Sequence, residues 1–209
     1  EENKFNWGYD PKNYNVPEGS YSLNPFDGTV RIKEYKQLIQ TLHSNNIRVI
    51  MDVVYNHTFD IENSNFQKTV PDYYYRKHGD TYSNASGCGN ETASERAMMR
   101  KYMVDSVVYW ATEYHIDGFR FDLMGIHDIK TMKAIRAALD QVDPTIMMYG
   151  EGWTSGDSPL AESKRAMKKA TRSLKGVGSF SDDIRDSLKG HVFEALDQGY
   201  ISGKPDMEN

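Results

Sequence analysis

The sequence contains very little cysteine: Cys88 is the only one among 209 residues. A single cysteine cannot form a disulfide within the chain. Cysteine and histidine residues also do not occur at the spacing of a zinc site. Both observations argue against a metal-centred or redox function, and they leave the cellular compartment open.

Long apolar runs are missing as well. No stretch approaches the roughly 20 apolar residues of a membrane span, so we expect no transmembrane segment. Residues 1–4 (EENK) do not resemble the start of a secretory signal. The chain as given is therefore expected to be soluble.

An excess of positive charge is also absent, because 25 Lys and Arg residues face 30 Asp and Glu residues, for a net charge of −5. A nucleic-acid backbone needs clustered positive charge, so nucleic acid is not expected as a partner. Aromatic residues, by contrast, reach 12% of the chain. That content argues against disorder and suits a hydrated surface on which rings stack.

Four short apolar segments have the pattern of strands that are buried on both faces. They cover residues 47–54, 116–122, 145–151 and, more weakly, 176–180. Helical apolar spacing lies between them, which predicts an α/β fold with a parallel sheet, either an open doubly wound sheet or a closed (β/α)8 barrel. A complete barrel takes roughly 250 residues and eight strands, so this chain would form about half of one.

The helical patterns have recognisable boundaries. Thr92 and Glu95 have the spacing of a capping box, Asp128 is a plausible N-cap, and Ser158 with Pro159 indicates a further helix start. The predicted helices cover residues 32–42, 95–114 and 129–140.

A long polar segment, residues 58–93, is rich in Tyr, Asn and Gly. An excursion of this length inside a compact domain is usually functional. We expect it to lie over the active site of a single domain that covers residues 1–209.

Polar side chains follow three of the predicted strands. Asp52 belongs to the first, Arg120 and Asp122 to the second, and Glu151 to the third. Ligands bind at the carboxyl edge of the sheet in α/β folds, so these groups are expected to meet in one pocket. The alternative is that each carboxylate caps the helix that follows it.

The two later carboxylates have different surroundings. Arg120 and Asp122 are two residues apart and would share one face of a strand, where the guanidinium favours an ionised carboxylate. Glu151 is close in sequence to Trp153, an apolar neighbour of the kind that raises the pKa of an acid. One ionised and one protonated carboxyl group suit retaining glycoside hydrolysis. An aspartic dyad or a two-metal site remains open, although the aromatic residues favour a sugar ligand.

Several runs of residues resemble a known family. Residues 52–57 (DVVYNH), 118–122 (GFRFD) and 149–153 (YGEGW) resemble the first three conserved regions of the α-amylase superfamily, in the same order. Residues 5–11 (FNWGYDP) resemble the signature of type I pullulanases, with Phe5 where Tyr is usual.

Two further runs are similar to pullulanase segments, namely 87–92 (GCGNET) and 180–186 (FSDDIRD). The resemblance extends from about Phe5 to Gly203.

The resemblance implies a role for each matching position. Asp122 would be the nucleophile and Glu151 the general acid/base, with Arg120 orienting Asp122. His57 would bond the sugar at the cleaved position, and Tyr9 would stack beneath it.

Other positions would support these. Asp52 would be a structural partner of Arg120, and Trp153 would bind substrate. No cofactor is required by the resemblance. Calcium is an optional ligand, for which Asn56, a calcium ligand in many α-amylases, is a weak candidate here.

The implied reaction is hydrolysis of α-1,6-glucosidic branch linkages in pullulan, amylopectin or dextrins, with net retention through a glucosyl-enzyme at Asp122. The partner would be an α-glucan. The resemblance favours a location outside a bacterial cell or on its surface over the cytoplasm.

One expected motif is missing. Nothing in the chain resembles the family's fourth region, which supplies a third carboxylate. The resemblance implies a partial catalytic domain that covers roughly strands 3 to 6 of the barrel, with little or no activity alone and a tendency to associate with itself or with the missing barrel portions. A glucan branching enzyme and a non-catalytic α-glucan-binding remnant are the alternatives.

Overall fold

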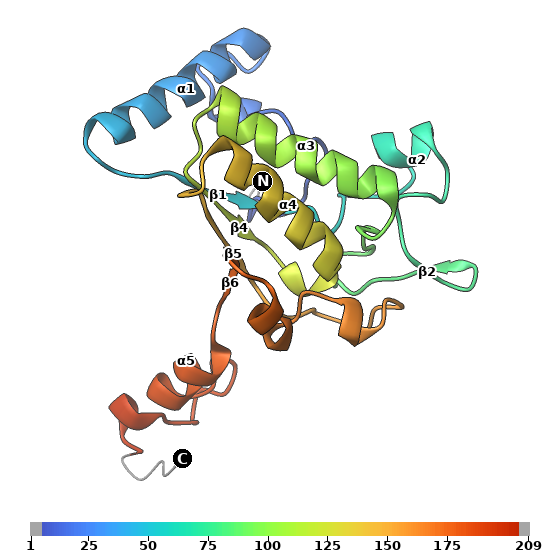
Figure 1. The fold of residues 1–209 in the computed structure, drawn as a ribbon, viewed down its shortest axis with the longest axis vertical. Helices are drawn as coiled ribbons and strands as arrows, with labels where there is room; N and C mark the ends of the chain where they lie inside the picture. Colours follow the sequence, from blue (N-terminus) through green and yellow to red (C-terminus); the bar gives the residue numbers. More distant parts are fainter. Residues whose placement is uncertain (1–5, 205–209) are drawn as a thin grey trace, which may run out of the picture.

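The computed structural model describes residues 6–204 of the chain, shown in Figure 1. Phe5 and both ends of the predicted 1–209 domain lie outside the described residues. None of the helices formed by residues 6–204 has both the length and the apolar composition that a membrane crossing requires.

A parallel sheet of four strands forms the centre of the molecule, in the order β1-β4-β5-β6. The strands are β1 (Ile50–Val53), β4 (Gly118–Phe121), β5 (Met147–Gly150) and β6 (Gly178–Ser179). The predicted α/β fold with a parallel sheet is therefore confirmed, although every strand is shorter than predicted. The register pairs Asp52 with Arg120 and Arg120 with Tyr149, so the carboxyl ends of the strands coincide.

Two helices cover one face of this sheet, α3 (Ala97–Glu113) and α4 (Ile129–Val142), and they pack side by side (Figure 1). Their apolar faces enclose the core together with residues of the strands. Asp128 accepts a hydrogen bond from the Thr131 amide at 3.0 Å and so caps α4 as predicted. The largest fully buried core side chains include Trp110, Tyr55, Phe119, Phe121, Met99, Met103 and Met132.

The first helix, α1 (Gly28–Ser44), is longer than the predicted 32–42 segment because Asp27 caps it through the Thr29 amide. Its predicted apolar stripe is only partly covered. Ile39 is buried, whereas Ile32 is 38% exposed and Leu38 is 53% exposed. The stripe therefore packs only in part against residues 6–204.

Two predictions about helix starts are wrong. The helix predicted for 95–114 begins at Ala97 with Arg96 as N-cap, and the Thr92 hydroxyl instead donates to the Tyr55 carbonyl at 2.6 Å. Glu95 lies 2.8 Å from Arg76 instead of capping the helix. The Arg76 guanidinium is buried, and leaving a buried charge unpaired costs more free energy than leaving a helix end uncapped. No α-helix begins at Ser158 or Pro159, where the sequence offers no regular apolar stripe and the chain next forms short 3-10 helices at 162–164 and 168–173.

The remaining elements are short. α5 (Asp182–Lys189) and η5 (Tyr200–Ser202) pack together and lie apart from the sheet at the bottom of Figure 1. The others are η1 (Gly19–Tyr21), α2 (Asn65–Thr69), β2 (Lys77–His78), β3 (Thr81–Tyr82), η2 (Met124–Ile126), η3 (Glu162–Lys164) and η4 (Lys168–Ser173).

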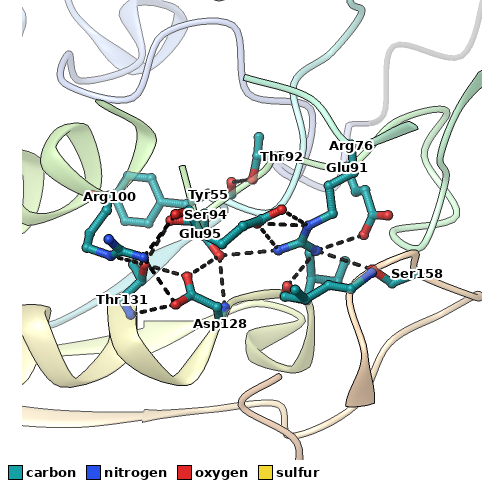
Figure 2. Close-up of polar contacts among 12 residues, drawn as sticks. Tyr55, Arg76, Glu91, Thr92, Ser94, Glu95, Arg100, Asp128, Thr131 and Ser158 are labelled. Carbon is teal, nitrogen blue, oxygen red and sulfur yellow. Dashed lines mark hydrogen bonds and ion pairs between the residues drawn. The ribbon is translucent and has the colours of Figure 1, made fainter. Parts of the chain in front are cut away.

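The long connection from β1 to α3 is tied to η2 and to the start of α4 by buried polar groups (Figure 2). Arg76 is 3% exposed and lies 3.1 Å from Glu91, which is fully buried. Arg76 also donates to the Ile126 carbonyl at 2.8 Å. Through Ser94 the cluster continues to Asp128 at the start of α4. Arg76 and Ser94 therefore anchor the connection to η2 and α4, the two helices that follow β4.

Candidate active site

The site residues meet at the carboxyl edge of the sheet. Asp52 lies on β1 and Arg120 on β4, while Asp122 and Glu151 directly follow β4 and β5. Gly150 allows β5 to lie close to β4, because a Cβ at this position would be 2.5 Å from the Phe121 carbonyl oxygen. The predicted convergence of these strand ends is therefore present.

Arg120 is the centre of the site. Its Nη1 lies 2.8 Å from Asp52 and 2.9 Å from Asp122, and its Nη2 lies 2.8 Å from Glu151. One planar guanidinium thus holds Asp122 and Glu151 through different nitrogens, which fixes the two carboxylates on the same rim. The side chains of Arg120, Asp122 and Glu151 are 15 to 18% exposed, so water screens the contacts of Arg120 with these two carboxylates weakly.

Asp122 is fixed by a second residue, Asn56. The Asn56 Nδ2 atom donates to Oδ2 of Asp122 at 2.9 Å and to its carbonyl oxygen at 3.0 Å. Asn56 is itself completely buried. Both carboxylate oxygens of Asp122 therefore have a donor, one from Arg120 and one from Asn56.

Glu151 has a different environment. Its Oε1 contacts Arg120, and its Oε2 accepts from the Leu123 amide at 2.9 Å. Burial raises the pKa of the Glu151 carboxyl above its usual range, and this outweighs the Leu123 amide and the Arg120 guanidinium, which lower it. Glu151 is thus the member of the pair that holds a proton more readily than an ordinary glutamate.

His57 and Tyr9 complete the polar site. The His57 Nδ1 atom lies 2.6 Å from Oδ1 of Asn56, and an amide oxygen only accepts, so Nδ1 carries the hydrogen. Burial lowers the pKa of His57, which leaves the ring neutral with Nε2 as an acceptor. Tyr9 donates to Asp52 at 2.6 Å, and this hydrogen bond is the main cause that raises the pKa of Tyr9 to about 12.

Trp153 follows Glu151 by two residues. It packs against an apolar cluster formed by Ala85, Leu123 and Ile126. Its ring centroid lies 6.4 Å from that of Phe180. Trp153 therefore packs against the cluster that contains Leu123, the residue whose amide donates to Glu151.

Sequence reasoning gave no role to Leu123 or Phe180. The Phe180 ring lies 5.8 Å from the Arg120 guanidinium carbon and stacks edge-on with Tyr149 at 5.5 Å. Its position at the end of the weakest predicted strand, residues 176–180, is a signal that could have identified it. Leu123 carries no such signal, because its contact with Glu151 is made by the backbone.

The residues around Asn56 do not fit a calcium site as they stand. The Asn56 amide oxygen is bonded to His57 and its nitrogen to Asp122. Within residues 6–204, no group of three or more His, Cys, Asp or Glu side chains is arranged to hold a metal ion.

Fold and site together define an α/β protein with a carboxylate-rich site at the carboxyl edge of a parallel sheet, where such folds bind ligands. A scan of family models matches none of them to the chain.

Full-length relatives are more informative. The chain is 46% identical over 201 residues to the pullulanase of Bacillus subtilis (strain 168), covering 95% of this chain and 28% of that protein. It is 39% identical over 215 residues to chloroplastic pullulanase 1 of Arabidopsis thaliana, covering 95% and 22%.

Solved structures agree. The pullulanase from Paenibacillus barengoltzii, in complex with maltohexaose and α-cyclodextrin, superposes with a TM-score of 0.93 at 52% identity, over 96% of this chain and 31% of that one. The pullulanase from Bacillus acidopullulyticus superposes with a TM-score of 0.93 at 52% identity, over 97% of this chain and 25% of that one. The resemblance is thereby confirmed: this chain is homologous to one region of the pullulanases, and it spans less than a third of the length of these relatives.

Proposed function

We propose that this chain carries the catalytic carboxylates of a debranching glycoside hydrolase, which cleaves α-1,6-glucosidic linkages in pullulan and related α-glucans with retention of configuration. One observation supports this above all others. A single guanidinium holds Asp122 and Glu151 on one rim, and burial raises the pKa of the Glu151 carboxyl above its usual range. Retaining glycosidases need two neighbouring carboxyl groups in different protonation states.

The chemistry would proceed in two displacements. Glu151 gives its proton to the glycosidic oxygen while that bond breaks, and an Asp122 oxygen bonds to the anomeric carbon. Glu151 then takes a proton from water, whose oxygen bonds to the same carbon as the ester to Asp122 breaks. Each displacement inverts the carbon, so the product retains its configuration.

The remaining residues would bind and orient the sugar. His57 presents a buried Nε2 that makes no hydrogen bond within residues 6–204, and in the neutral ring it can accept from a sugar hydroxyl. Tyr9 lies beside Arg120, with 5.8 Å from the guanidinium carbon to its ring, and would stack beneath the sugar. Asp52 fixes both Tyr9 and Arg120, and Trp153 would contribute an apolar wall.

We also propose that the four strands correspond to strands 3 to 6 of a (β/α)8 barrel, with residues 58–93 lying over the active site of the same domain. Contacts of the excursion support this placement. The Ala85 carbonyl accepts from the Ser155 amide at 3.0 Å, four residues after Glu151. The Thr92 amide donates to the Asn56 carbonyl at 2.8 Å.

Activity can be tested in the frame of a longer relative. Residues 6–204 replace the matching region of the Bacillus subtilis pullulanase, and release of reducing ends from pullulan is measured. We expect an active chimera, and loss of turnover by at least about 10³-fold in Asp122→Ala, because the covalent step loses its nucleophile. An inactive but folded chimera would count against the proposal.

The chain alone is proposed to have little or no activity, since it lacks the third carboxylate region. That absence also favours a second candidate, a non-catalytic α-glucan-binding module. Under that alternative, maltotriose binding measured by calorimetry persists in Asp122→Ala and the chimera gives no turnover. A branching enzyme would instead lengthen an added acceptor glucan without releasing reducing ends.

A further inference from the structure

The residue after the proposed nucleophile has an unusual backbone. Leu123 is left-handed, with φ of 41° and ψ of 48°, in a region that non-glycine residues rarely occupy. A strained backbone persists only where its surroundings hold it in place. The contacts of Leu123 therefore matter more than its chemical type suggests.

The peptide bond between Asp122 and Leu123 is held on both sides. Its carbonyl oxygen accepts from Nδ2 of Asn56 at 3.0 Å, and its N–H donates to Oε2 of Glu151 at 2.9 Å. A second hydrogen bond joins the same two segments, from the Gly125 amide to the backbone carbonyl of Glu151 at 2.9 Å. One peptide plane thus contacts both the group that orients Asp122 and the carboxyl of Glu151.

The Leu123 side chain is enclosed by other parts of the chain. It is 9% exposed and packs with Ala85, Ile126 and Trp153. The backbone carbonyl oxygen of Leu123 accepts a hydrogen bond from the Ile126 amide at 2.9 Å. These contacts come from the excursion, from η2 and from the segment after β5, so three parts of the chain converge on one residue.

We propose that Leu123 is a positioning residue for this site, which acts through its left-handed backbone by aiming the Asp122–Leu123 amide at Oε2 of Glu151. The amide favours the ionised carboxylate that Glu151 becomes after it gives up its proton. The same peptide plane fixes the distance between the nucleophile and the acid. This inference rests on the roles proposed above for Asp122 and Glu151.

Two substitutions separate the backbone from the side chain. Leu123→Val keeps much of the apolar packing, but branching at Cβ disfavours the left-handed region. Leu123→Gly loses all packing and adopts that region readily. A backbone role therefore predicts that Val is the more harmful change, and a packing role predicts the reverse order.

The measurement is an NMR titration of 13C-labelled glutamate carboxyl groups in the 209-residue chain, with Glu151→Gln to identify the resonance. In Leu123→Val we expect the Glu151 pKa to rise by about one unit, the loss of one hydrogen bond to a charged group. In Leu123→Gly we expect it to stay near the parent value. An equal or larger shift in Leu123→Gly would overturn the proposal.

A second measurement needs no substitution at position 123. In the parent chain, the amide proton of Leu123 should titrate with the same midpoint as the Glu151 carboxyl, and this titration should vanish in Glu151→Gln. An amide shift that ignores Glu151 also overturns the proposal. Neither readout uses substrate, so an inactive chimera would count against the proposed function and leave these results standing.

Discussion

At the scale of single residues, one guanidinium sets the charge balance of the site. Arg120 lies 2.8 to 2.9 Å from three carboxylates, those of Asp52, Asp122 and Glu151. One cation cannot fully compensate three neighbouring anions, so the site favours a proton on one of them. Burial raises the pKa of the Glu151 carboxyl, so Glu151 is the group on which we expect that proton. The proposed acid and the proposed nucleophile thus have different surroundings although they share the same arginine.

The buried side chain of His127 makes the stability of the chain depend on pH. His127 is fully buried and neither ring nitrogen has a hydrogen-bond partner within residues 6–204. Burial, assisted by the nearby Arg76, lowers its pKa to about 3 from 6.5. The folded state then binds fewer protons than the unfolded state, so this contribution to stability is complete above pH 6.5 and decreases as the pH falls towards 3.

We expect the free energy of unfolding of the parent chain to fall by about 1.4 kcal/mol more per pH unit below 6.5 than that of His127→Gln. Urea denaturation from pH 4 to pH 8 measures both proteins. A glutamine side chain does not titrate in this range, so the difference between the two stability curves isolates the contribution of His127. Parallel curves would contradict a neutral buried imidazole.

Residue pattern alone predicts part of this site. Two-residue spacing places Arg120 and Asp122 on one strand face, and the 2.9 Å contact between them confirms it. The same reasoning brings Glu151 to the same edge. The Leu123 amide could not be predicted, because neither a backbone donor nor a left-handed φ can be recognised from a leucine in the sequence.

At the scale of elements, the excursion between β1 and α3 is held by charges rather than by apolar packing alone. Arg76 lies between Glu91 and Glu95 (Figure 2). Its Nη1 also donates to the carbonyl of Ile126, a residue of η2. A buried ion pair of this kind costs desolvation energy, so its two partners depend on each other. The excursion should therefore detach from the sheet when one partner is removed.

We predict that Glu91→Ala lowers the free energy of unfolding by about 3 to 5 kcal/mol, because it leaves the buried Arg76 without its fully buried partner. Asp105→Ala is the matched control. It breaks the exposed pair between Asp105 and Lys101, and such pairs contribute only about 0.3 to 0.5 kcal/mol. Urea denaturation compares the variants, and equal effects would contradict an anchoring role for Arg76.

The same cluster explains why element boundaries were predicted unevenly. Asp128 caps α4 as its position in the sequence indicates. Thr92 and Glu95 have the spacing of a cap, yet they bind Tyr55 and Arg76, residues 37 and 19 positions away. A local pattern cannot reveal a long-range partner, and here burial of Arg76 overrides it.

At the scale of the whole molecule, the two faces of the sheet differ. Phe119 and Phe121 face the helices and are fully buried, whereas Ile50 is 37% exposed and Met147 is 46% exposed. β1 and β6 each have a strand neighbour on one side only among residues 6–204. A parallel sheet is normally covered on both faces, so this one presents an incompletely covered face and two open edges.

We therefore predict that the isolated chain associates in solution. At about 0.1 mM, sedimentation velocity should show species larger than a monomer, because exposed apolar surface and open strand edges pair between chains. Ile50→Lys places a charge on the uncovered face and should shift the distribution towards monomer. Val142→Lys, at a position on α4 that is 39% exposed, is the control and should leave the distribution unchanged. A parent chain that sediments only as a monomer would contradict the prediction. It would show that the uncovered face and the open strand edges do not bind one another at this concentration.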